Sequence, residues 1–297
     1  MEFIVVVGYL EIFCSLVSFL SSFRIFLVIV LGSDLRKMRS YQIMAYIAFM
    51  ECWQMSATLL GGIMVSQQSK LNDTLYAVVG NIAFSAWMTL LVLRCCLALN
   101  RFTVLTSFSR VSFLEHRRFH SVLMLFPTTV LLSIIILCII YGHPFVMIIE
   151  LGGWNFIGID PCRPIESFFS NGMTSCAFGL YLTTFIYIIK MKHQTHMHVD
   201  LGEFRILISS AVAFSYEMCM IILFHCIFPF IEVPPWTVGV IGILWSFLPG
   251  FNGIMLLTIN RNFRSRFFSL KWSTVSTTHV LFNRVPNIFS ATSSLQH

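Results

Sequence analysis

The feature that most limits the fold of this 297-residue chain is a series of seven apolar runs, each long enough to cross a lipid bilayer. A membrane-spanning helix needs about 20 mostly apolar residues. The runs cover residues 3–31, 41–65, 75–99, 121–141, 167–189, 206–230 and 236–259. Charged residues make up only 11% of the chain, whereas a soluble domain carries about 25%. The sequence therefore predicts an all-α membrane protein, a bundle of seven transmembrane helices in a lipid bilayer.

The two ends of the chain also fit a membrane bundle. The first run is too long for the core of a signal peptide and follows Glu2 rather than a basic region, so we expect it to be a retained span. Arg24, near its inner end, is expected to snorkel. Phe and Arg residues after the seventh run predict a short amphipathic helix on the inner leaflet. We expect one seven-span domain over residues 1–270 and a disordered, Ser/Thr-rich cytoplasmic tail over residues 271–297.

Charge in the loops indicates which way the bundle points. Segments 32–40, 100–120, 190–205 and 260–297 each carry net positive charge, and the segments on the other side of the bundle carry net negative charge when taken together. Because positive charge marks the cytoplasmic side, the N-terminus is predicted outside and the C-terminus inside. The sequon Asn72-Asp73-Thr74 then lies outside, which makes Asn72 a candidate glycosylation site.

Three charged residues lie inside the apolar runs. Arg94 lies within the third run, Glu51 within the second and Glu217 within the sixth. Such residues are costly in a membrane, so they usually face the bundle interior and pair with one another. We expect Arg94 to pair with Glu51 or Glu217, and a purely structural ion pair is an equally good interpretation of these residues.

Three short motifs resemble those of rhodopsin-like G-protein-coupled receptors. Residues 100–102 (NRF) resemble the Asp-Arg-Tyr of that family, and residues 226–229 (CIFP) resemble its Cys-Trp-x-Pro. Residues 252–264 resemble its Asn-Pro-x-x-Tyr followed by Phe-Arg, although Gly253 and Leu256 replace the Pro and the Tyr. The resemblance implies that five residues couple the receptor to a heterotrimeric G protein or take part in its conformational switch. These residues are Asn100, Arg101, Phe102, Pro229 and Asn252.

Further local features resemble the nematode serpentine chemoreceptors, class T most of all. They lie at residues 41–51, 98–101, 154–161 (WNFIGIDP) and 245–250 (WSFLPG). The resemblance implies a chemosensory receptor in the plasma membrane, including that of a sensory cilium. Its implied partners are a small-molecule ligand and a G protein, and no cofactor is expected.

The chain departs from the wider family at one structural bond. Rhodopsin-like receptors usually join the outer end of the third helix to the second outer loop by a disulfide. Tyr76 stands where that cysteine would be, so Cys162, which we place in the loop, lacks its usual partner. The outer loop is expected to be held in some other way.

Candidate pocket residues follow from their depth in the runs. Asn81, Phe84 and Trp87 lie in the outer half of the third run, Phe230 follows the proline of the sixth, and Trp245 lies outward of Asn252. Ligands of helix bundles bind between helices, so these side chains are predicted to line a cavity. Packing of the aromatic side chains is an equally good explanation for any one of them.

Other functions find little support. The sequence has no nucleophile–base set, phosphate loop or catalytic metal spacing, so we expect no enzyme, and we expect no nucleic-acid partner because the positive charge follows membrane topology. His193, His196 and His198 are interpreted as a solvated loop rather than a metal site. The alternatives left open are a seven-span transporter or channel, although no internal repeat is visible, and a degenerate receptor that does not signal.

Overall fold

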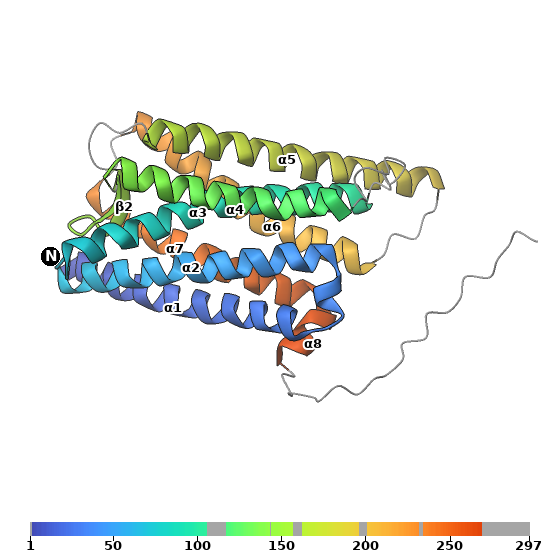
Figure 1. Cartoon of the computed structure of the whole chain (residues 1–297), viewed down its shortest axis with the longest axis horizontal. Helices are drawn as coiled ribbons and strands as arrows, with labels where there is room; N and C mark the ends of the chain where they lie inside the picture. Colours follow the sequence, from blue (N-terminus) through green and yellow to red (C-terminus); the bar gives the residue numbers. More distant parts are fainter. Residues whose placement is uncertain are drawn as a thin grey trace, which may run out of the picture.

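Seven long helices form a single bundle (Figure 1). The computed structural model describes residues 2–105, 117–142, 144–156, 162–195, 201–231 and 234–268. Its long helices are α1 (Glu2–Leu31), α2 (Arg39–Gln67), α3 (Asp73–Leu105), α4 (Arg117–Ile140), α5 (Cys162–Thr195), α6 (Leu201–Ile222) and α7 (Pro235–Ile259). Each of these helices, α6 together with the residues that follow it, provides a segment that is long and apolar enough to cross a membrane. The prediction of a seven-transmembrane all-α bundle is confirmed. The tail over residues 271–297 lies outside the described residues.

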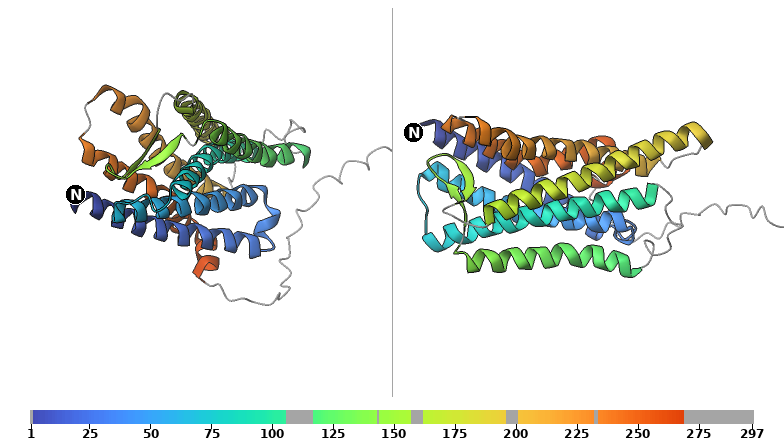
Figure 2. Two further views of the ribbon diagram at one scale, coloured as in Figure 1. Left: turned by 60° about the vertical axis from the view of Figure 1, so that its left-hand side comes forward. Right: turned by 90° about the horizontal axis from the view of Figure 1, so that it is seen from above.

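Helix α3 is the central helix of the bundle. It packs against α2, α4 and α5 and touches α6, and most of its residues between Val79 and Arg101 are buried. Helix α4 packs chiefly on α3 and lies at the outer edge of the bundle (Figure 2). Side chains on α3 are therefore placed to contact several other helices at once.

A β-hairpin marks one end of the bundle, which we call the hairpin end. Strands β1 (Phe145–Ile148) and β2 (Gly153–Phe156) pair antiparallel between α4 and α5. The sequence did not predict these strands. Gly80 of α3 lies against the carbonyl of Phe145, where any larger side chain would collide with the hairpin backbone. Nearby, the Tyr76 hydroxyl donates a hydrogen bond to the Met147 carbonyl at 2.7 Å. The hairpin is thus held to α3 at the position where related receptors have a disulfide.

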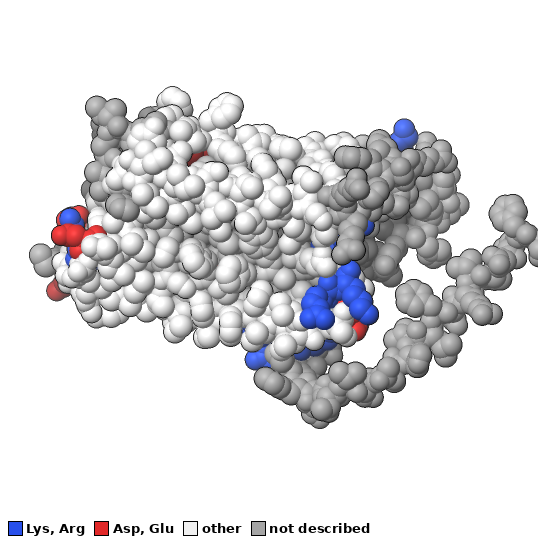
Figure 3. All heavy atoms as spheres, viewed as in Figure 1, with Lys and Arg blue, Asp and Glu red and all other residues white. Residues whose placement is uncertain are grey.

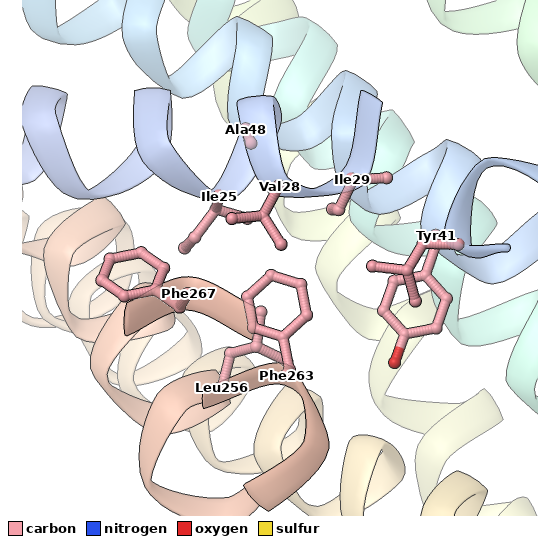
Figure 4. Close-up of a cluster of buried hydrophobic side chains, with 9 residues drawn as sticks. Ile25, Val28, Ile29, Tyr41, Ala48, Leu256, Phe263 and Phe267 are labelled. Carbon is pink, nitrogen blue, oxygen red and sulfur yellow. The ribbon is translucent and has the colours of Figure 1, made fainter. Parts of the chain in front are cut away.

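The opposite end, which we call the α8 end, carries a short helix after the seventh span. Helix α8 (Arg261–Phe268) is amphipathic as predicted. Phe263 and Phe267 pack between α1, α2 and α7 beside Ile25 and Leu256 (Figure 4). This docking also gives Arg24 a partner for its head group at the α8 end of α1. Its Nε and Nη2 donate to the carbonyl of Phe267, at 2.9 Å and 2.6 Å, near the C-terminus of α8.

Surface charge separates the two ends. On the face seen in Figure 3, Lys and Arg gather mainly at the α8 end. There Arg266 of α8 contacts Asp34, which precedes η1 (Leu35–Lys37), at 3.0 Å. Hydrogen bonds from Ser33 and Arg266 hold the pKa of Asp34 below its ordinary value. This exposed pair ties α8 to the turn between α1 and α2, and pairs of this kind contribute little to stability.

Helix α6 does not continue regularly to its end. It passes into a π-helical segment, η3 (Leu223–Ile227), and then into a 3-10 turn, η4 (Phe228–Phe230), which contains Pro229. The irregularity begins earlier than Pro229, and π segments often occur at functional sites because they change which side chains face inward.

We predict that Tyr76→Phe loosens the hairpin while Tyr9→Phe does not. Tyr76→Phe removes the hydrogen bond to Met147, which should lower the free energy of unfolding by about 1 kcal/mol. Tyr9 is a matched control because it is exposed on the outside of α1. Hydrogen exchange of residues 145–156 in purified protein is the measurement. Equal protection of the hairpin in both variants would contradict the role assigned to Tyr76.

Candidate functional site

A cavity of about 110 Å³ lies at the hairpin end, between α2, α3, α5, α7, the segment that follows α6 and the hairpin. Most of its wall is aromatic. The aromatic side chains that line it are Phe84, Trp87, Phe145, Trp154, Phe156, Phe224, Phe228 and Trp245. The polar side chains on the wall are Gln54, Thr58 and Glu166. A largely apolar cavity with a few polar groups is the usual form of a small-molecule site.

Ring contacts hold the wall together. Trp87 of α3 and Trp245 of α7 have ring centroids 4.3 Å apart. Phe84 lies 5.5 Å from Phe145 and 5.4 Å from Phe156, centroid to centroid, so the hairpin packs directly on α3. Aromatic pairs in this range stabilise a core beyond their buried area. The hairpin is therefore both a loop at this end and a part of the cavity wall.

The structure brings together three of the five pocket candidates. Phe84, Trp87 and Trp245 line the cavity, whereas Asn81 is not among its lining residues. Phe230 is 84% exposed and lies away from the cavity, which corrects the prediction for this residue. Phe228 lines the cavity instead. The prediction rested on the position of Phe230 directly after Pro229, and the irregular segment formed by η3 and η4 presents Phe228 to the cavity.

Glu166 is a site residue that the hydropathy pattern does not predict. Helix α5 begins at the buried Cys162, which was expected to lie in the outer loop, so Glu166 lies in the helix. Two donors hydrogen-bond to Glu166 Oε1, Trp87 Nε1 at 3.3 Å and Ser170 Oγ at 2.8 Å, and His225 Nε2 contacts the same oxygen at 3.3 Å. The carboxylate thereby links α3, α5 and the π segment. The Glu-x-x-x-Ser spacing was a signal that could have placed Glu166 on a helix.

A charged cluster lies deeper in the bundle. Arg94 of α3 forms ion pairs with Glu217 of α6 and with Glu51 of α2, the second at 3.7 Å. Ser22 of α1 donates to Glu51 Oε2 at 2.8 Å, and Asn252 of α7 donates to Glu51 Oε1 at 3.0 Å. The predicted pairing of Arg94 is confirmed, and both candidate acids are its partners. Partners thus contact both oxygens of Glu51.

The Asn100-Arg101-Phe102 triplet lies at the α8 end, but most of it is covered. Arg101 is fully buried, with its Nη2 4.0 Å from the sulfur of Met44 on α2. Asn100 donates to the hydroxyl of Ser40 at 2.8 Å, and Phe102 is partly buried. The family resemblance implies that this triplet takes part in coupling to a G protein. In this conformation Arg101 is closed off, so a partner protein would reach it only after the helices at this end separate.

Metal-binding side chains do not cluster in the part of the chain that the structure describes. No group of three or more His, Cys, Asp or Glu side chains is arranged to hold a metal ion there. Of the three histidines considered in the sequence, His196 and His198 lie outside the described residues, and the side chain of His193 is not described.

The family of the chain follows from its match to a family profile. Residues 4–279 match the family described as serpentine type 7TM GPCR chemoreceptor Srt. The chain belongs to this family. The predicted resemblance to nematode serpentine chemoreceptors is thereby confirmed, and the seven helices of this Srt protein make it a multi-pass membrane protein. No curated protein is significantly similar to it.

We predict that Arg94→Gln lowers the free energy of unfolding by about 3 kcal/mol, because it leaves two buried carboxylates without their cation. The double variant Arg94→Gln/Glu217→Gln should be less destabilised than Arg94→Gln alone, since it also removes one of the unpaired acids. Thermal unfolding of the purified protein measures this, with the exposed Arg36→Gln as control. A double variant no more stable than Arg94→Gln would contradict the coupling.

Proposed function

We propose that this Srt protein is a chemosensory receptor of the plasma membrane that binds a small ligand in the hairpin-end cavity and activates a heterotrimeric G protein at the α8 end. The observation that carries the proposal is that the cavity and the charged cluster share two elements. Helix α3 supplies Trp87 to the cavity and Arg94 to the cluster. The sixth span supplies His225 next to the cavity and Glu217 to the cluster.

Through these shared elements, ligand binding at the hairpin end affects the arrangement of the helices at the α8 end. A ligand that binds one arrangement of Trp87, Glu166 and His225 better than another shifts the bundle toward that arrangement. Movement of the sixth span then acts on the pair between Arg94 and Glu217. Separation of the helices at the α8 end would uncover Arg101, which is the residue proposed to meet the G protein.

The orientation follows from the same proposal. The hairpin end, with the N-terminus and Asn72, faces outside, and the α8 end faces the cytoplasm, in agreement with the distribution of positive charge. Asn72 is exposed, and its Oδ1 accepts hydrogen bonds from the backbone N–H groups of Thr74 and Leu75, at 2.8 Å and 3.2 Å, at the start of α3. Its amide nitrogen is the atom that a glycan would modify.

We predict that Asn72 carries a glycan when the protein is expressed in animal cells. Asn72→Asp keeps an oxygen that can cap α3 and removes the acceptor nitrogen, whereas Thr74→Ala leaves Asn72 in place and destroys the sequon. Both variants should lose the mobility shift that a glycosidase produces with the natural chain. A shift that persists in both variants, or is absent from the natural chain on the cell surface, would count against this site.

We predict that Glu217→Gln raises ligand-independent G-protein signalling several-fold, because it weakens the link between α3 and α6 while Arg94 keeps its contact with Glu51. Adding Arg101→Ala should return the signal to background, and adding Arg36→Ala, an exposed arginine at the same end, should not. A generic G-protein reporter in cells, corrected for surface expression, is the measurement. A signal unaffected by Arg101→Ala would contradict the proposed coupling, and ionic current or solute flux in purified protein would favour a channel or transporter.

A further inference from the structure

Glu166 gives the cavity an acceptor that its neighbours do not fill. Trp87 and Ser170 both donate to Oε1, and His225 contacts the same oxygen. These contacts within the described part of the chain all fall on Oε1 and leave Oε2 open to a donor from the cavity. Glu166 is 5% exposed overall and lies on the cavity wall. A carboxylate on a largely buried wall favours a bound group that donates to it.

The charge of the wall favours a cation over a neutral donor. None of the residues that line the described cavity is Lys or Arg. Arg94, the nearest candidate on α3, is not on the wall, because it is paired with Glu51 and Glu217 deeper in the bundle. His225 is the basic group that faces Glu166, and it contacts Oε1 rather than Oε2. The second oxygen therefore faces no fixed positive charge from the described wall.

The rest of the wall is also suited to a cation. Aromatic faces attract a cation through their quadrupoles, with tryptophan the strongest of them. Trp87 and Trp245 lie side by side on the wall, and Trp87 also donates to Glu166. Phe84 and Phe156 add further rings. A carboxylate at one point of an aromatic wall matches a ligand with a charged head and an apolar body.

We propose that the cavity recognises a small protonated amine, whose ammonium group donates to Glu166 Oε2 while its apolar body lies among the aromatic rings. This inference rests on the proposed function, because it takes the cavity as the ligand site. The volume of about 110 Å³ limits the size of the amine. A protein cavity of about 150 Å³ accommodates benzene, so this smaller cavity favours an amine smaller than benzene, such as one with a short branched chain.

The test uses two probes of nearly equal size and shape, isobutylamine and isobutanol, with the full chain purified in lipid nanodiscs. Binding is measured by the shift of the unfolding temperature and by calorimetry. Isobutylamine should bind about tenfold or more tightly than isobutanol, the size of one charge-assisted hydrogen bond. Glu166→Gln should weaken binding of isobutylamine by a similar factor and leave that of isobutanol nearly unchanged. Glu150→Gln is the matched control, because it removes an exposed acid at the same end outside the cavity wall.

Each outcome bears on the inference. Equal affinity for the two probes, no binding of isobutylamine, or a folded Glu166→Gln protein that binds the amine as the natural chain does would overturn it. The comparison of the two probes on the natural chain needs no variant, so misfolding of Glu166→Gln would not remove the test. Amine binding that depends on Glu166 but produces no G-protein signal would uphold the site and contradict the signalling function. If the Glu217→Gln variant signals through a G protein but the natural chain binds the two probes equally, the signalling function is upheld and the amine site is contradicted.

Discussion

The buried charge of Arg94 is the constraint on which the rest of the bundle depends. A charge moved from water into a membrane interior is stabilised only if its partners are in place, because desolvation otherwise costs several kcal/mol. Its two carboxylates come from α2 and α6, and the groups that hold Glu51 come from α1 and α7. Five helices must therefore keep a fixed depth relative to one another, which apolar side chains alone would not specify.

Helical spacing extends this constraint to both ends of the bundle. Trp87, Arg94 and Arg101 are each separated by two turns, so they lie on nearly the same face of α3. One residue contacts the cavity, one holds the charged cluster, and one is buried at the α8 end. The sixth span is linked to two of the three levels: Glu217 pairs directly with Arg94, and His225 contacts Glu166, to which Trp87 donates. A displacement of α6 relative to α3 therefore acts on more than one level.

The sequence predicted those parts of the fold that depend on hydropathy and on charge in the membrane. The seven helices, the amphipathic α8 and the pairing of Arg94 all follow from the cost of placing polar groups in lipid. Glu166 and Phe228 could not be found in this way. Glu166 required knowledge of where α5 begins, and Phe228 required knowledge of the π segment, and both depend on tertiary packing rather than on local composition. The β-hairpin was missed for the same reason.

The attachment of the hairpin has a consequence for how a ligand acts. A disulfide contributes about 2–4 kcal/mol, whereas one hydrogen bond, such as that of Tyr76, contributes about 1 kcal/mol. The hairpin must then be held mainly by packing, through Gly80 against Phe145 and through the rings of Phe145 and Phe156, whose centroids lie 5.5 Å and 5.4 Å from that of Phe84 on α3. These two aromatic residues also line the cavity. A ligand in the cavity would complete the packing that holds the hairpin in place, so ligand binding and the order of this loop would be thermodynamically linked.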